Sequence, residues 1–146
     1  MRRKLAGILG FSLAVNGLLM LFFAQTWYQM VPGASASGPF NPHFVRDIGC
    51  AYLASGGALA WFLYDARARG GALAGAAFLA LHALVHLWDV SAGRESLATM
   101  KLDLPDIYMP ALLALWIAWP QSPFQTEDAN VQMADAQPAR HIRPDL

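Results

Sequence analysis

The chain has a single cysteine, Cys50, and few charged residues. One cysteine cannot form a disulfide or a pair of metal-binding thiolates within one chain. Charged residues make up only 14% of the 146 positions, and ten Lys and Arg balance ten Asp and Glu. Binding to a polyanion draws on a surplus of basic side chains that releases counterions. The composition therefore argues against nucleic acid as a partner.

Hydrophobic residues, in contrast, make up 56% of the chain. This fraction exceeds the range typical of soluble domains and indicates the lipid bilayer as the partner. A helix that rises about 1.5 Å per residue needs roughly 20 residues to cross a hydrocarbon core of about 30 Å. Four apolar segments approach this length. We therefore predict an all-α integral membrane protein with four spans, at about residues 5–27, 44–64, 71–89 and 106–120.

The first apolar segment has a rival interpretation as a secretory signal peptide. Residues 2–4 are basic, and the sequence Ala-Ser-Ala at 34–36 resembles a cleavage site. However, the apolar run is longer than the core of a signal peptide needs, and residues 34–36 lie well beyond its end. We therefore favour an uncleaved first span.

The connections and the basic residues predict a topology. Residues 30–42 are rich in Pro, Gly and Ser and predict a loop, residues 65–71 a short polar turn, and residues 90–105 a second, charged loop. Lys and Arg near span ends resist translocation. One side of the predicted membrane carries Arg2, Arg3, Lys4, Arg67 and Arg69, and the other carries Arg46, Arg94 and Lys101. The first side, with both termini, is therefore predicted to be cytoplasmic.

These connection lengths favour antiparallel neighbours and hence a four-helix up-and-down bundle in residues 1–120. Gly71 and Gly75 give the third predicted span a face of small residues on which another helix can pack closely. Residues 121–146 are polar and are predicted to form a disordered cytoplasmic tail.

Ionisable residues gather at the external ends of the second and third predicted spans. A charged group in hydrocarbon is costly and tends to face a partner or a cavity. His43 and Asp47 are four residues apart, His82 and His86 are four apart, and Asp89 follows three later. Each set therefore occupies one helix face. Antiparallel packing of the two spans would bring all five residues together.

The functional hypothesis is a site for a transition metal or haem. In this hypothesis the imidazoles are ligands, and Asp47 or Asp89 is a ligand or orients one. The residues between His82 and His86 lack the Glu of the H-E-x-x-H motif, which argues against a zinc protease of that type. Haem would be held between one of these two histidines and His43. A proton relay and a pocket for a small polar ligand stay open as alternatives.

The structural alternative assigns these residues no ligand. Arg46 would form an ion pair with Asp47, with Asp89 or with both, and the histidines would hydrogen-bond between helices. Asn16, a polar residue in the first predicted span, is expected to form such a bond as well. The chain would then be a non-enzymatic accessory or structural subunit of a membrane complex, or a homo-oligomer.

The stretch Asn-Pro-His-Phe-Val-Arg-Asp-Ile-Gly at 41–49, followed by His-Ala-Leu-Val-His at 82–86, resembles a known pattern. The pattern occurs in uncharacterised bacterial four-helix membrane proteins that are broadly similar to the DoxX-like group. The resemblance covers the second and third predicted spans. It implies a four-helix fold in a bacterial plasma (inner) membrane. Because the DoxX name is linked with quinol oxidase subunits, it also implies a redox or accessory role.

Overall fold

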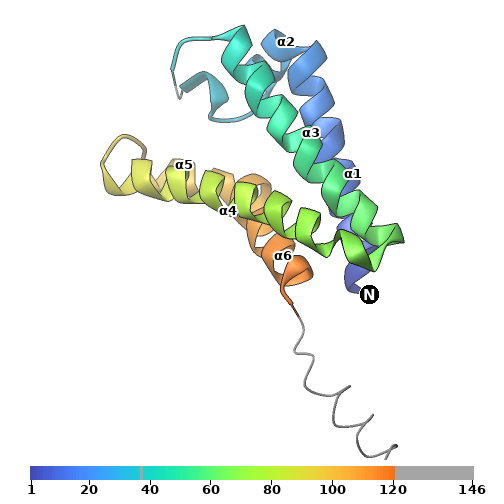
Figure 1. The fold of residues 1–146 in the computed structure, drawn as a ribbon. Helices are drawn as coiled ribbons and strands as arrows, with labels where there is room; N and C mark the ends of the chain where they lie inside the picture. Colours follow the sequence, from blue (N-terminus) through green and yellow to red (C-terminus); the bar gives the residue numbers. More distant parts are fainter. Residues whose placement is uncertain (37, 121–146) are drawn as a thin grey trace, which may run out of the picture.

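The computed structural model describes residues 1–36 and 38–120, which form helices without any β-strand (Figure 1). The helices are α1 (Arg2–Phe22), α2 (Ala24–Met30), α3 (Pro42–Tyr64), α4 (Arg69–Ser91), α5 (Leu97–Asp103) and α6 (Met109–Ala118). Shorter turns are η1 (Ala34–Ala36), η2 (Ala66–Ala68) and the π-helical turn η3 (Leu104–Tyr108). The predicted all-α class is confirmed. The predicted tail at 121–146 lies outside the described residues.

The first predicted span is divided into two helices at Phe23, which has a non-helical backbone. The indole Nε1 of Trp27 donates to Oδ1 of Asn16 at 2.9 Å. In one straight helix these two residues would be about 16 Å apart along the axis. The bend at Phe23 brings them together, so that α2 folds back toward α1. Asn16 thus bonds to a residue of its own predicted span, because that span is divided into two helices, and not to another span as expected.

Helix α3 begins where its sequence provides a cap. The side chain of Asn41 accepts hydrogen bonds from the backbone amides of His43 and Phe44, and Pro42 occupies the first turn. Amides in the first turn of a helix have no partner within it, so a capping Asn and an early Pro both favour this start.

Helices α1 and α3 pack antiparallel with their backbones in contact, and glycines make this possible. A Cβ atom on Gly10 would lie 2.6 Å from the carbonyl oxygen of Gly56, and one on Gly56 would lie 2.6 Å from that of Gly10. Gly17 and Gly49 form a second such contact, at 2.6 and 3.0 Å. The predicted face at Gly71 and Gly75 is less crowded, since only Gly75 closely approaches a backbone, that of Ser55 in α3.

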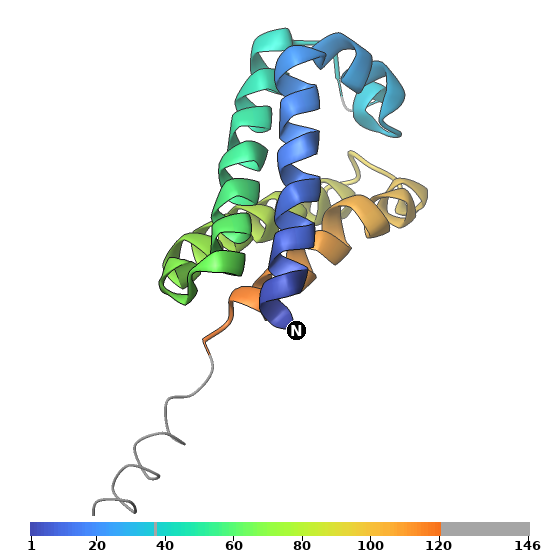
Figure 2. The same ribbon diagram turned by 90° about the vertical axis from the view of Figure 1, so that its right-hand side faces the viewer.

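The helices form two pairs that meet at one end. Figure 1 shows α4 leaving α3 at a steep angle after the turn η2, and Figure 2 shows α4 and α6 crossing the direction of the α1 and α3 pair. The structure therefore does not confirm a single up-and-down bundle. The start of α1, the turn η2 and the end of α6 lie close together at the junction of the two pairs (Figure 2).

Among the described residues, two helical segments are long and apolar enough to cross a membrane, namely Arg2–Phe22 and Ala66–Ser91. Helix α3 has 23 residues but also carries Arg46 and Asp47, while α6 has only 10 residues. Large apolar side chains nevertheless point outward from all the long helices. Examples are Phe11, Phe22, Phe44, Trp61, Leu81, Leu84, Leu112 and Trp116.

The backbone contact between α1 and α3 predicts different effects of alanine at two neighbouring glycines. Gly56→Ala places a methyl group against the Gly10 carbonyl and should lower the free energy of unfolding by about 1–3 kcal/mol. At Gly57 a Cβ atom meets nothing within 4 Å. Gly57→Ala should therefore raise stability by up to about 1 kcal/mol through helix propensity. Thermal unfolding in detergent measures both, and equal shifts would contradict the contact.

Candidate metal centre

The structure separates the five residues that the sequence predicts to converge. His43 and Asp47 lie near the start of α3, whereas His82, His86 and Asp89 lie near the end of α4, and these two helix ends diverge (Figure 1). Helices α3 and α4 are in contact from the turn η2 as far as Tyr52 and His82 and diverge beyond these residues, which explains the separation. The five residues therefore do not form one site in this structure.

The residues at the start of α3 have local partners. Nε2 of His43 lies 3.5 Å from Oδ2 of Asp47, and both side chains are largely exposed. Arg46 does not form the expected ion pair with Asp47, because consecutive residues on a helix face in different directions. Instead its Nε donates to the carbonyl oxygen of Leu21 at 3.2 Å. This carbonyl lies in the last turn of α1, where helix carbonyls lack partners within the helix.

Two of the three predicted ligands on α4, Asp89 and His82, contact other side chains of the protein and do not face a shared metal site. Asp89 binds Nη1 of Arg94 at 2.8 Å. The ring of His82 lies edge-on to Tyr52, with 5.9 Å between ring centroids, and stacks with Phe78 at 6.0 Å. Its centroid is 5.0 Å from that of His86. His82 is therefore held by aromatic rings between α3 and α4.

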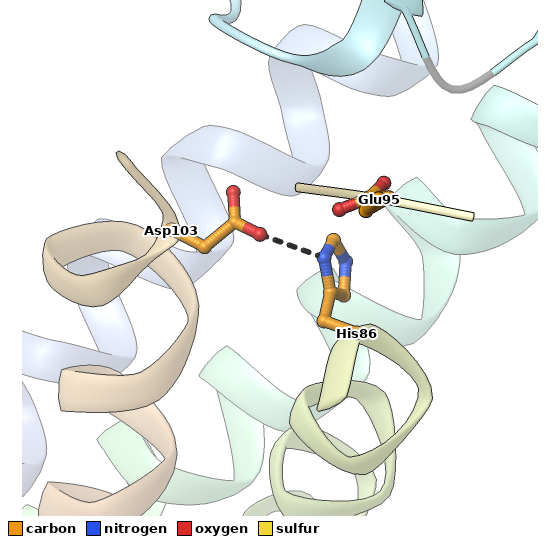
Figure 3. Close-up of side chains that lie close together, drawn as sticks. All are labelled: His86, Glu95 and Asp103. Atoms are coloured by element: carbon orange, nitrogen blue, oxygen red, sulfur yellow. Dashed lines mark hydrogen bonds and ion pairs between the residues drawn. The ribbon is translucent and has the colours of Figure 1, made fainter. Parts of the chain in front are cut away.

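His86 is the predicted residue that joins a cluster of possible ligands. Its Nδ1 lies 3.0 Å from Oδ2 of Asp103, and Glu95 approaches the same imidazole. One ligand atom from each of the three residues lies within 4.8 Å of the other two. Figure 3 shows both carboxylates beside the ring of His86. We call His86, Glu95 and Asp103 the metal cluster.

The chain forms this cluster by reversing direction after α4. Gly93 has a φ of 70°, a conformation that glycine adopts without a steric penalty. The amides of Arg94 and Glu95 then donate to the carbonyl of Asp89, at 2.9 and 3.3 Å, which brings Glu95 back over the end of α4. Oγ of Ser96 accepts from the amide of Thr99 at 3.1 Å and caps α5. Helix α5 ends in Asp103, which faces His86.

Two oxygen atoms near this cluster are buried without a hydrogen-bond partner among the described residues. They are Oε2 of Glu95 and the hydroxyl of Tyr108. Both Glu95 and Asp103 lie close enough to Tyr108 to act on it electrostatically. Burying a polar atom without a partner costs about 1–3 kcal/mol, and a charged one costs more. The cluster therefore has unsatisfied capacity to bind a donor or a cation.

One imidazole and two carboxylates are suitable ligands for a divalent transition metal. The 3.0 Å between His86 and Asp103 already suits adjacent ligands of one ion with bonds of about 2.0–2.2 Å. Glu95 would move inward to complete three protein ligands, which leaves a further coordination position for water or another ligand. Alternatively, Asp103 would accept a hydrogen bond from Nδ1–H and orient a ring that binds metal through Nε2.

Sequence analysis identified His86 and missed Glu95 and Asp103. Both carboxylates fall in the segment 90–105, which was predicted to be a hydrated loop. The apolar residues Leu97, Met100 and Leu104 have helical spacing after Ser96, and this signal indicates a capped helix. A helix there would have turned Asp103 toward the end of α4.

Searches against family models, curated proteins and solved structures return no match to this chain. The resemblance to the DoxX-like group therefore stays a prediction, and the candidate site is assigned from the geometry of the chain itself.

Proposed function

We propose that this chain is a multi-span helical protein of the bacterial plasma membrane that binds a divalent transition-metal ion at the metal cluster. The observation that carries the proposal is the buried Oε2 of Glu95, which has no hydrogen-bond partner among the described residues and lies beside His86 and Asp103. An ion bound there would neutralise two carboxylates and satisfy this oxygen. Zinc is the first ion to test, because it accepts both imidazole and carboxylate ligands.

Haem receives less support than a metal ion. Bis-histidine ligation needs a second imidazole on the opposite face of the porphyrin. His82 lies on the same helix as His86, and His43 lies at the diverging end of α3 beside Asp47. The geometry thus favours an ion held by His86 and the two carboxylates.

The structural alternative has its own supporting observation. The contact between His86 and Asp103 joins α4 to α5, and that between Asp89 and Arg94 holds the intervening loop. A subunit without a ligand could use both contacts to fix its helices. This alternative does not explain the unpartnered oxygen of Glu95.

Placement in the membrane is supported by the two candidate spans and by the outward-facing apolar side chains of all the long helices. We propose that α1, α3, α4 and the η3–α6 segment all cross the bilayer, with both termini cytoplasmic. For this, α4 and α6 would incline toward α1 and α3 about the connection at η2, because α4 leaves α3 steeply in Figure 1.

The metal proposal predicts that each chain binds one zinc ion. The test uses the whole protein without a histidine tag, purified in detergent and stripped of metal beforehand. Zinc at 100 times its Kd should then stabilise the fold by about 2.7 kcal/mol. His86→Ala and Glu95→Gln should each weaken zinc binding at least about tenfold. Calorimetry and elemental analysis measure affinity and stoichiometry.

His43→Ala and Asp47→Asn are the matched controls, because they remove an imidazole and a carboxylate outside the cluster. Both should bind zinc like the wild type. Glu95→Gln should also keep or raise the stability of the metal-free protein, since an uncharged amide replaces a buried carboxylate. If neither zinc nor manganese binds the wild type stoichiometrically, and all these substitutions alter only stability, the metal proposal is wrong.

The proposed topology predicts alternating accessibility along the chain. In a Cys50→Ser background, cysteines introduced at the exposed residues Ser35, Ala66 and Leu97 follow α1, α3 and α4 respectively. An impermeant maleimide should label the first and third in intact cells and should spare Ala66→Cys until the cells are permeabilised. Labelling of Ala66→Cys in intact cells, with protection of the other two, would reverse the proposed orientation. Equal labelling of all three would reject alternation.

A further inference from the structure

A second candidate site lies at the junction of the two helix pairs, at the opposite end of α4 from the metal cluster. A cavity of about 410 Å³ opens there between the ends of α1, α3, α4 and α6. Its size falls within the range of about 300–1,000 Å³ that is typical of small-molecule sites. The residues on which the argument depends are Arg2, Arg3, Arg69, Phe62 and Trp119. We call this the arginine pocket.

The arginine pocket is strongly basic. Three guanidinium groups line it, and the described residues that line it include no Asp or Glu. The nearby carboxylate of Asp65 accepts a hydrogen bond from the amide of Arg67 at 2.8 Å. Helix α4 also begins at Arg69, and the N-terminus of a helix adds a partial positive charge. Positive charges held this close together repel one another, and a bound anion would reduce the repulsion.

Arg3 and Arg69 are held in place by uncharged groups, and no carboxylate lies among the described residues that line the pocket. Nε of Arg3 donates to the carbonyl of Phe62 at 3.1 Å, and its two terminal nitrogens stay available for a ligand. The guanidinium of Arg2 lies 4.4 Å from the ring centroid of Trp116, and that of Arg69 lies 5.9 Å from that of Phe62. Stacking on aromatic rings orients a guanidinium without neutralising it.

We propose that the arginine pocket binds a phosphate-bearing anion, and that this anion is the headgroup of an anionic phospholipid. Guanidinium groups match the geometry of phosphate oxygens. The exposed ring of Trp119 provides apolar surface beside the arginines, where the glycerol and the start of the acyl chains would pack. The pocket also lies on the side of the protein that the basic residues predict to be cytoplasmic. Anionic lipids are abundant in the cytoplasmic leaflet of the membrane.

This inference rests on the membrane location but not on metal binding. Helix α4 has 23 residues and is therefore about 34 Å long, so the arginine pocket and the metal cluster are well separated. Failure of either ligand to bind would leave the other test unaffected.

The test uses the full-length protein in detergent and native mass spectrometry. Phosphatidylglycerol should bind at one molecule per chain, whereas phosphatidylcholine with the same acyl chains should bind much more weakly. Each arginine near an anionic surface contributes roughly a fivefold gain in affinity, so Arg3→Gln/Arg69→Gln should weaken phosphatidylglycerol binding about 25-fold. Arg3→Lys/Arg69→Lys keeps both charges but loses the guanidinium geometry, so it should weaken binding less than the glutamine pair does.

The matched control is Arg46→Gln/Lys101→Gln, which removes the same charge from exposed positions outside the pocket and should bind phosphatidylglycerol like the wild type. If the double glutamine variant is unstable, Arg69→Gln alone should still show about a fivefold loss. Equal losses in the pocket and control variants would overturn the site. Displacement of phosphatidylglycerol by inorganic phosphate at comparable concentration would identify a soluble anion and overturn the lipid assignment.

Discussion

The close contact between the backbones of α1 and α3 is the constraint on which the rest of the structure depends. Gly10 meets Gly56, and Gly17 meets Gly49, at distances that leave no room for a Cβ atom. If the chain lies in lipid as proposed, there is little hydrophobic gain from joining two apolar helices, and close packing of this kind would provide much of the association. The contact fixes the end of α3, and hence the position of the turn η2 from which α4 departs. The two candidate sites lie near opposite ends of α4, whose placement depends on this first pair.

The division of polar groups between the two ends of the second pair is sharp. The surface between them is apolar, with Leu81, Leu84 and Leu112 pointing outward. Arginines gather at the junction, whereas carboxylates gather around the far end of α4 and the start of η3. The π-helical turn η3 widens the helix between Pro105 and Pro110 and carries Tyr108 into the buried region beside Asp103. Turns of this kind are frequent at functional sites, because they alter which side chains face inward.

Local patterns in the sequence predicted the positions of the helices well, but they did not predict how the helices pack together. Hydrophobic runs located α3 and α4 to within a few residues, because that signal acts within one helix. The break at Phe23 escaped prediction, since it depends on the contact between Trp27 and Asn16 rather than on Pro or Gly. Helical spacing correctly placed His82 and His86 on one helix. Helical spacing could not show that α4 diverges from α3. The prediction therefore placed His86 with His43 and Asp47, whereas in the structure His86 lies beside Glu95 and Asp103.

Some of the charges near each end of α4 oppose its helix dipole, and this links the two candidate sites. The N-terminus of a helix carries a partial positive charge and favours anions, yet Arg69 begins α4 and two further arginines line the same pocket. The C-terminus carries a partial negative charge and favours cations, yet Glu95 and Asp103 surround it. Arg94 compensates Asp89 only, through their ion pair. Neither excess charge stabilises the helix, and each end would gain from a ligand of opposite sign. An anion at the arginine pocket and a cation at the metal cluster would therefore relieve the same electrostatic conflict from opposite ends of one helix.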